Sequence, residues 1–104
     1  SFMLREGVRR MGTMFRELKG VKVSYDRQGY IFFISRNYKD LSREKQAAID
    51  ALCRNIGGED YAAALKEFMT SHRSAVSVSK SNYLSKETLY RYVRRYYEEF
   101  PKEF

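Results

Sequence analysis

The segment "LSREKQAAIDALCRNIGG", residues 41–58, constrains the fold most strongly because its apolar residues recur at intervals of three and four. That spacing is typical of one face of an α-helix. Ser42 stands where an N-cap residue is needed, and Gly57 and Gly58 follow as a stop signal. The apolar stripe consists of Ala48, Ile49, Leu52, Cys53 and Ile56.

A second helix is predicted directly after the two glycines, in "EDYAAALKEFMTSH". Tyr61, Leu65, Phe68 and Met69 share one of its faces. Because so short a link leaves little room between the two helices, we expect them to pack as neighbours.

The N-terminal residues 1–20 predict a basic amphipathic helix that ends at Gly20. Such a helix also suits a membrane surface, but the other segments offer a core against which it can pack. No apolar stretch approaches eighteen residues, and no signal peptide is visible, so we expect a cytoplasmic protein with no membrane partner. The helical stripe consists of Leu4, Val8, Met11, Phe15 and Leu18.

Residues 21–35 allow two interpretations. Val21, Val23 and Tyr25 alternate with polar residues, "DRQG" is typical of a turn and "YIFFIS" is rich in strand formers, which together indicate a short β-hairpin. The alternative is a helix, since apolar residues from Ile31 to Leu41 are spaced at three, four and three. We favour a helix over residues 29–40.

The segment "SNYLSKETLYRYVRRYYEEF", residues 81–100, predicts a long helix with Ser85 as N-cap and Pro101 as its stop. Arginines occupy the rest of its circumference, and Tyr90 and Tyr97 flank the apolar stripe. The stripe consists of Leu89, Tyr92, Val93, Tyr96 and Phe100.

A short helix fits into "SAVSVSKSNYL", just ahead of this long one. Two helices joined by a tight turn, the second with polar and basic residues at its start, form the arrangement that places a helix in the DNA major groove. Helix N-termini and hydroxyl groups bind phosphate, and arginine suits bidentate contact with guanine.

The stretch "LSKETLYR" resembles the recognition helix of helix-turn-helix DNA-binding proteins, whose pattern is apolar, Ser, two variable residues, Thr, apolar, any residue, Arg. Over residues 21–104 the chain is similar to short regulators carried on phages and conjugative elements of Gram-positive bacteria. The resemblance implies that five residues face DNA, namely Ser85, Lys86, Tyr90, Arg91 and Arg94.

The same resemblance places Ser79 at the small position of the first helix, and Leu84 and Leu89 between the helices. The sequence departs from the motif in the turn. Tyr83 occupies the customary glycine position, and Asn82 stands where an apolar residue is frequent. Asparagine tolerates the left-handed backbone that such a turn requires.

We therefore predict a mainly all-α protein with a single domain over residues 1–104. Its parts are the basic helix of residues 1–20, a helical scaffold over 21–71, and a helix-turn-helix with a long C-terminal helix over 72–104. The net charge of +7 and a pI near 9.6 favour a polyanionic partner. All of the excess lies in residues 1–30 and 71–104, whereas residues 31–70 are neutral.

No constellation of residues indicates an enzyme. Cys53 is the only cysteine and His72 the only histidine, and neither has an identifiable catalytic partner in the sequence. "IGGED" lacks the lysine and hydroxyl residue of a phosphate-binding loop. We expect no catalytic activity, metal or cofactor.

The predicted function is sequence-dependent binding of double-stranded DNA by a transcriptional regulator or accessory factor of a mobile element. The resemblance also implies a homodimer on paired half-sites.

One alternative is a protein-interaction module without DNA binding. It would pair Glu87 with Arg91 along the helix surface, and the neighbouring arginines with Glu98 and Glu99. Its docking surface would expose Tyr90, Tyr97, Phe100 and Phe104 together. The other alternative is a small DNA-packaging or phage structural component.

Overall fold

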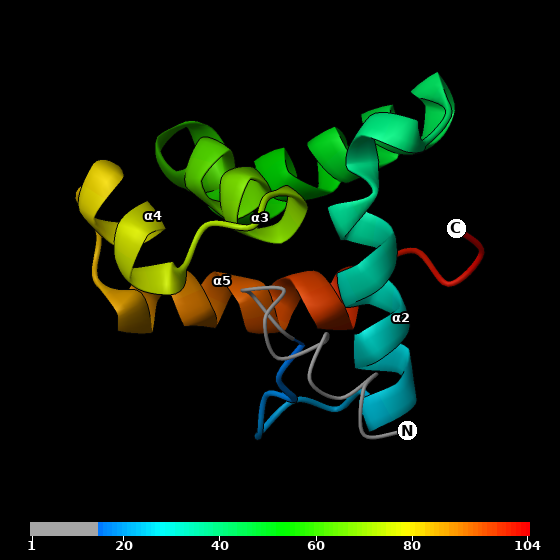
Figure 1. Cartoon of the computed structure of the whole chain (residues 1–104), viewed down its shortest axis with the longest axis horizontal. Coiled ribbons are helices and arrows are strands. Elements are labelled where there is room, and N and C mark those ends of the chain that lie inside the picture. The colour runs from blue at the N-terminus through cyan, green and yellow to red at the C-terminus, as the bar shows by residue number, and fades with distance from the viewer. Residues whose placement is uncertain (1–14) are drawn as a thin grey trace, which may run out of the picture.

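The computed structural model describes residues 15–104, which form helices and no strand (Figure 1). The prediction of a mainly all-α fold is confirmed. In Figure 1, α5 runs beneath α3, with α4 at its beginning and α2 near its end. The elements are α2 (Tyr25–Arg36), the 3-10 helix η1 (Tyr38–Asp40), α3 (Arg43–Thr70), α4 (Ala75–Ser81) and α5 (Lys86–Glu99).

A serine caps the start of each of these four α-helices. Its side-chain oxygen accepts a hydrogen bond from the backbone N–H three residues on, over 3.0 to 3.2 Å. An N-cap of this kind stabilises a helix by about 1 kcal/mol relative to alanine. The predicted caps at Ser42 and Ser85 are confirmed, and Ser24 and Ser74 play the same role for α2 and α4.

The β-hairpin considered for residues 21–35 is wrong, and the favoured helix begins four residues earlier than predicted. The buried positions of α2 are Gln28, Ile31, Phe32 and Ser35, at helical spacing. Two of these four are polar, so the apolar pattern of the sequence did not reveal the true buried face. The helix ends at Arg36, and Asn37 caps it through backbone bonds to the last turn.

The helix predicted over residues 1–20 lies mainly outside the described residues. Where the chain is described, from Phe15 to Gly20, it is not helical, so that part of the prediction is wrong. The buried side chain of Gln28 binds this segment: its oxygen accepts from Leu18 N at 2.9 Å, and its nitrogen donates to Leu18 O and Val23 O. These bonds satisfy backbone groups that a helix would otherwise have paired.

The two glycines in α3 fold the chain back on itself, as the sequence predicted. Gly58 has φ 65° and ψ −162°, which is outside the helical region. The Lys66 ammonium lies 2.9 Å from the Asp50 carboxylate, whereas in a straight helix these residues would stand about 24 Å apart. The two halves of α3 therefore lie side by side.

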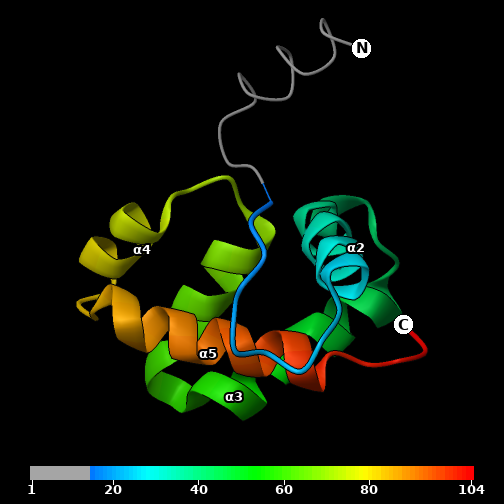
Figure 2. The same cartoon turned by 90° about the horizontal axis from the view of Figure 1, so that it is seen from below.

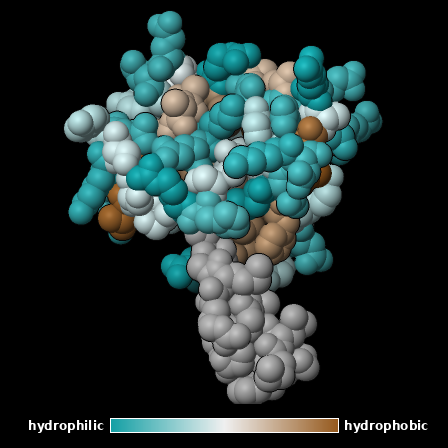
Figure 3. All heavy atoms as spheres, turned by 45° about the horizontal axis from the view of Figure 1, so that its top comes forward, coloured by the Kyte–Doolittle hydropathy of each residue, from teal (hydrophilic) through white to brown (hydrophobic). Residues whose placement is uncertain are grey.

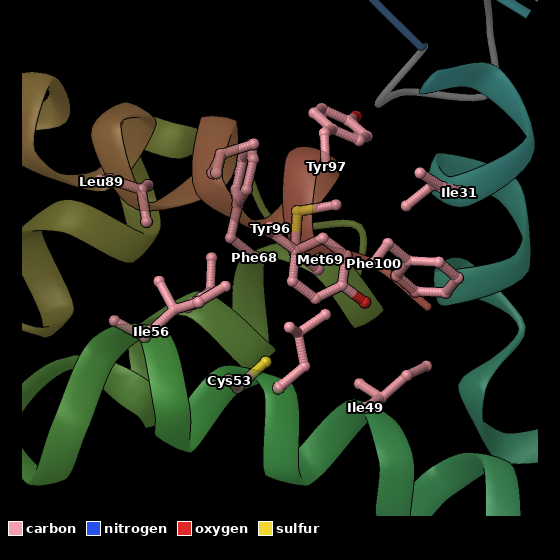
Figure 4. Packing of buried hydrophobic residues seen from close by; sticks show 14 of the residues in the cluster. Ile31, Ile49, Cys53, Ile56, Phe68, Met69, Leu89, Tyr96, Tyr97 and Phe100 are labelled. Atoms are coloured by element: carbon pink, nitrogen blue, oxygen red, sulfur yellow. The ribbon is translucent and has the colours of Figure 1, made fainter. Parts of the chain in front are cut away.

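The core lies between both halves of α3 and one face of α5, with Ile31 of α2 at its edge (Figure 4). The predicted stripe of α5 is confirmed except at Tyr92, which is half-buried and packs its ring 5.5 Å from Tyr61. Tyr97, predicted at the edge of the stripe, is buried instead. Phe100 completes the buried face, and the helix ends before Pro101 as predicted.

Candidate nucleic-acid interface

The connection from α4 to α5 is a Schellman motif with an unusual residue. Leu84 N donates to Ser79 O at 3.1 Å, and Tyr83 N donates to Lys80 O at 3.4 Å. The motif requires a left-handed residue after the C-cap, and Tyr83 has φ 57° there. Glycine is the usual occupant of such a position. The backbone at Tyr83 is therefore left-handed at the place where the sequence departs from the helix-turn-helix pattern.

The packing of α4 against α5 depends on a small residue at position 79 and on apolar residues at positions 84 and 89. Ser79 is buried in α4, and its hydroxyl has no hydrogen-bond partner in residues 15–104. Leu89 is fully buried, and Leu84 packs against the core from the turn. A small side chain at position 79 leaves the room that the turn and α5 occupy.

Ser85 begins α5 and uses its hydroxyl within the helix. Its oxygen accepts from Thr88 N at 3.0 Å and donates to Thr88 Oγ1 at 3.0 Å. The side chain is exposed, yet it has no further proton to donate. The backbone N–H groups of Lys86 and Glu87 at the helix start remain available to an anion.

Lys86 and Arg91 are the two exposed cations in the first half of α5. Neither forms an ion pair with another residue of the described chain. Of the three pairs expected along the helix surface, the structure contains only Arg95 with Glu99, at 3.0 Å. The expected pair of Glu87 with Arg91 does not form, and the Lys86 and Arg91 side chains therefore remain accessible to a partner.

The segment that follows Phe15 crosses the second half of α5 (Figure 2). Arg94 Nε donates to the backbone oxygen of Lys19 at 3.4 Å, and Glu98 accepts from the backbone nitrogen of Lys22 at 3.4 Å. These contacts hold Arg94 and Glu98 apart from each other. The predicted DNA contact Arg94 is consequently half-buried and less accessible than Lys86.

Three of the five predicted residues lie along one side of α5, at successive helical turns: Lys86, Tyr90 and Arg94. They line a groove of about 1010 Å³. Tyr90 is half-buried there, and its ring meets Phe68 edge-on with centroids 5.9 Å apart. Ser85 and Arg91 are not among the groove residues. The structure thus divides the predicted site between this groove and the exposed start of the helix.

Sequence reasoning missed the opposite wall of the groove, which comes from distant segments. Phe15 and Arg16 contribute from the N-terminal side, and Phe32 contributes from α2. Phe15 also packs its ring 5.4 Å from Phe32. No local signal could have found these residues, because Phe15 and Arg16 belong to the segment that crosses α5 and Phe32 belongs to α2, both distant in sequence from α5.

The docking surface expected for a protein-interaction module does not form. Tyr97 and Phe100 are each 4% exposed, and the Phe104 ring packs 4.8 Å from Phe100. On the face shown in Figure 3, hydrophobic residues appear as separate groups in a mainly hydrophilic surface. The four aromatic residues therefore present no common exposed patch.

Other chemistry is sparse in the described residues. Cys53 is buried in the core, and burial raises the pKa of its thiol to about 12. Across residues 15–104, no three His, Cys, Asp or Glu side chains gather as metal ligands would. The helices of this region are too short or too polar to span a bilayer.

Comparison of the chain with protein-family models, curated proteins and solved structures found no significant match.

Proposed function

We propose that this protein binds double-stranded DNA through α4, the turn and the first half of α5, used as a helix-turn-helix. The observation that carries the proposal is the accessible start of α5, where Lys86 and Arg91 are exposed and have no ion-pair partner among residues 15–104. A recognition helix reads base edges with its N-terminal residues. Residues 15–22 cross the second half of α5 and leave uncovered its first turns, whose residues would read base edges.

Each group has a definite use in this proposal. The unpaired N–H groups at the start of α5 and the Lys86 ammonium would hold phosphates, which fixes the register of the protein on the duplex. The planar guanidinium of Arg91 would reach a base edge, with guanine as its preferred partner. Tyr90 and Arg94 would contact the backbone beside the groove, since packing limits their reach.

The net charge of +7 supplies long-range attraction to a polyanion. The resemblance of residues 84–91 to recognition helices supports a regulator or accessory factor of a mobile element, acting in a bacterial cytoplasm. A homodimer would place two copies of α5 in successive major grooves.

The test is a salt titration of binding to a fluorescent random duplex, followed by anisotropy. We expect a dissociation constant on the order of 10⁻⁴–10⁻⁶ M at physiological salt and a steep dependence on salt. The double substitution Lys86→Ala/Arg91→Ala should lower the slope of log K against log salt by about 1 to 2.

The matched control is Lys39→Ala/Arg43→Ala, which removes two exposed charges from η1 and the start of α3. It should weaken binding less, because the chain between α2 and α3 lies away from the start of α5 (Figure 1). Absence of binding at about 50 mM salt would refute the proposal. Equal losses in both double variants would show a general charge effect and would refute the assignment to α5.

A further inference from the structure

The groove beside α5 combines a positive rim with an apolar floor. Its charged rim residues are Arg16, Lys86 and Arg94, and no Asp or Glu of residues 15–104 lines it. The floor is apolar and largely aromatic. It includes the buried side chains Phe32, Phe68, Val93 and Tyr97.

The Tyr97 hydroxyl gives the apolar floor of the groove one polar group. Tyr97 is 4% exposed and lines the groove, and its hydroxyl makes no hydrogen bond to any residue in the described chain. In Figure 4 the ring points away from Tyr96 and Met69. The ring is buried while the hydroxyl oxygen retains contact with solvent, so an oxygen of a groove occupant could accept its proton.

We propose that this groove binds an acidic amphipathic helix of a partner protein. A helix of this kind lays its apolar face on an apolar groove floor. Its carboxylates would meet Arg16, Lys86 and Arg94, and one carboxylate or carbonyl oxygen would accept from Tyr97. The DNA backbone has negative charge for the rim but no apolar surface for the aromatic floor. An acidic amphipathic peptide has both, so the groove favours a peptide.

A consequence rests on the proposed function: the partner helix and DNA exclude each other. Lys86 lies both on the rim of the groove and at the start of α5, so one ammonium group cannot serve both ligands. The partner would therefore act as an inhibitor of DNA binding by direct competition.

The probe is a fluorescent peptide of about sixteen residues, with Leu or Phe at helical spacing on one face and Glu elsewhere. The same peptide with Gln in place of Glu is its control. We expect the acidic peptide to bind the full chain and the Gln peptide to bind at least about tenfold more weakly.

Two charge variants separate this proposal from DNA binding. Arg16→Glu changes an exposed rim residue outside α5, and it should weaken the peptide about tenfold while DNA still binds. Arg91→Ala should weaken DNA and leave the peptide unaffected. Tyr97→Phe removes only the hydroxyl and should weaken the peptide by several-fold. Circular dichroism checks that each variant is folded.

Unlabelled peptide should also release a labelled duplex from the wild-type protein. The protein could fail to bind DNA and still bind the peptide, with weaker binding in Arg16→Glu and Tyr97→Phe. The groove would then be a peptide site, and only the competition with DNA would be refuted. Absence of peptide binding, or binding that is indifferent to both Arg16→Glu and Tyr97→Phe, overturns the proposal. So does self-association that Arg16→Glu abolishes, since the occupant would then be a second copy of the chain.

Discussion

The hydroxyl groups of Ser35 and Tyr96 lie 2.7 Å apart in the core, where they join α2 to α5. Both side chains are completely buried. Removing one hydroxyl leaves the other without a partner, which costs about 1–3 kcal/mol. We expect Tyr96→Phe and Ser35→Ala each to lower the free energy of unfolding by about 1–2 kcal/mol. In urea denaturation, the double variant should lose less free energy of unfolding than the two single variants lose together. Strictly additive losses would contradict a hydrogen bond between the two hydroxyl groups.

The stability of the protein should fall at alkaline pH. Burial raises the pKa of Cys53 and of Tyr97 to about 12, and it also raises the pKa of Tyr96. The unfolded chain loses these protons near the ordinary values of 9.0 for cysteine and 10.0 for tyrosine. Above pH 9 the folded state therefore binds more protons than the unfolded state, and the free energy of unfolding decreases as pH rises.

Each group contributes a slope of about 1.4 kcal/mol per pH unit between its unfolded and folded pKa values. Urea midpoints measured from about pH 7 to pH 11 should be constant at first and then decline. Tyr97→Phe removes one of the three groups, so its decline above pH 10 should be shallower than that of the wild type. A stability that rises above pH 10 would contradict this account.

The comparison of α3 with α2 explains which parts of the fold could be predicted from the sequence. The buried face of α3 is a continuous apolar stripe ended by two glycines, and both signals are local. The buried face of α2 includes Gln28 and Ser35, whose burial depends on Leu18, Val23 and Tyr96. Since these partners are distant in sequence, hydrophobic periodicity could not identify that face.

The candidate site divides in the same way. Lys86, Tyr90 and Arg94 stand four residues apart, which places them on one side of a helix, and in the structure they line one groove. The accessibility of Arg94 could not be predicted, because it depends on the backbone of Lys19. The position of Arg16 across the groove depends on the same crossing of residues 15–22.

The turn between α4 and α5 should become more stable if Tyr83 is replaced by glycine. Tyr83 has φ 57° and is 94% exposed, so its side chain contributes little packing. A non-glycine residue in the left-handed region costs about 1–2 kcal/mol, part of which the entropy of glycine offsets. We expect Tyr83→Gly to raise the free energy of unfolding by about 0.5–1 kcal/mol. Tyr83→Ala retains the backbone strain and should not stabilise the protein. Urea denaturation of both variants tests this, and equal effects would contradict it.

The same change, glycine to alanine, should have opposite effects at Gly58 and Gly29. Gly58 has φ 65° and ψ −162°, a region almost confined to glycine, so Gly58→Ala should destabilise the protein by about 1–3 kcal/mol. Gly29 lies inside α2, and the nearest atoms to an added Cβ belong to the Phe15 ring, the closest at an ordinary contact distance of 3.6 Å. Gly29→Ala should therefore stabilise the protein by about 0.5–1 kcal/mol. Thermal and urea unfolding of the two variants provide the measurement. A neutral Gly58→Ala variant would show that the two halves of α3 need no left-handed residue to fold back on each other.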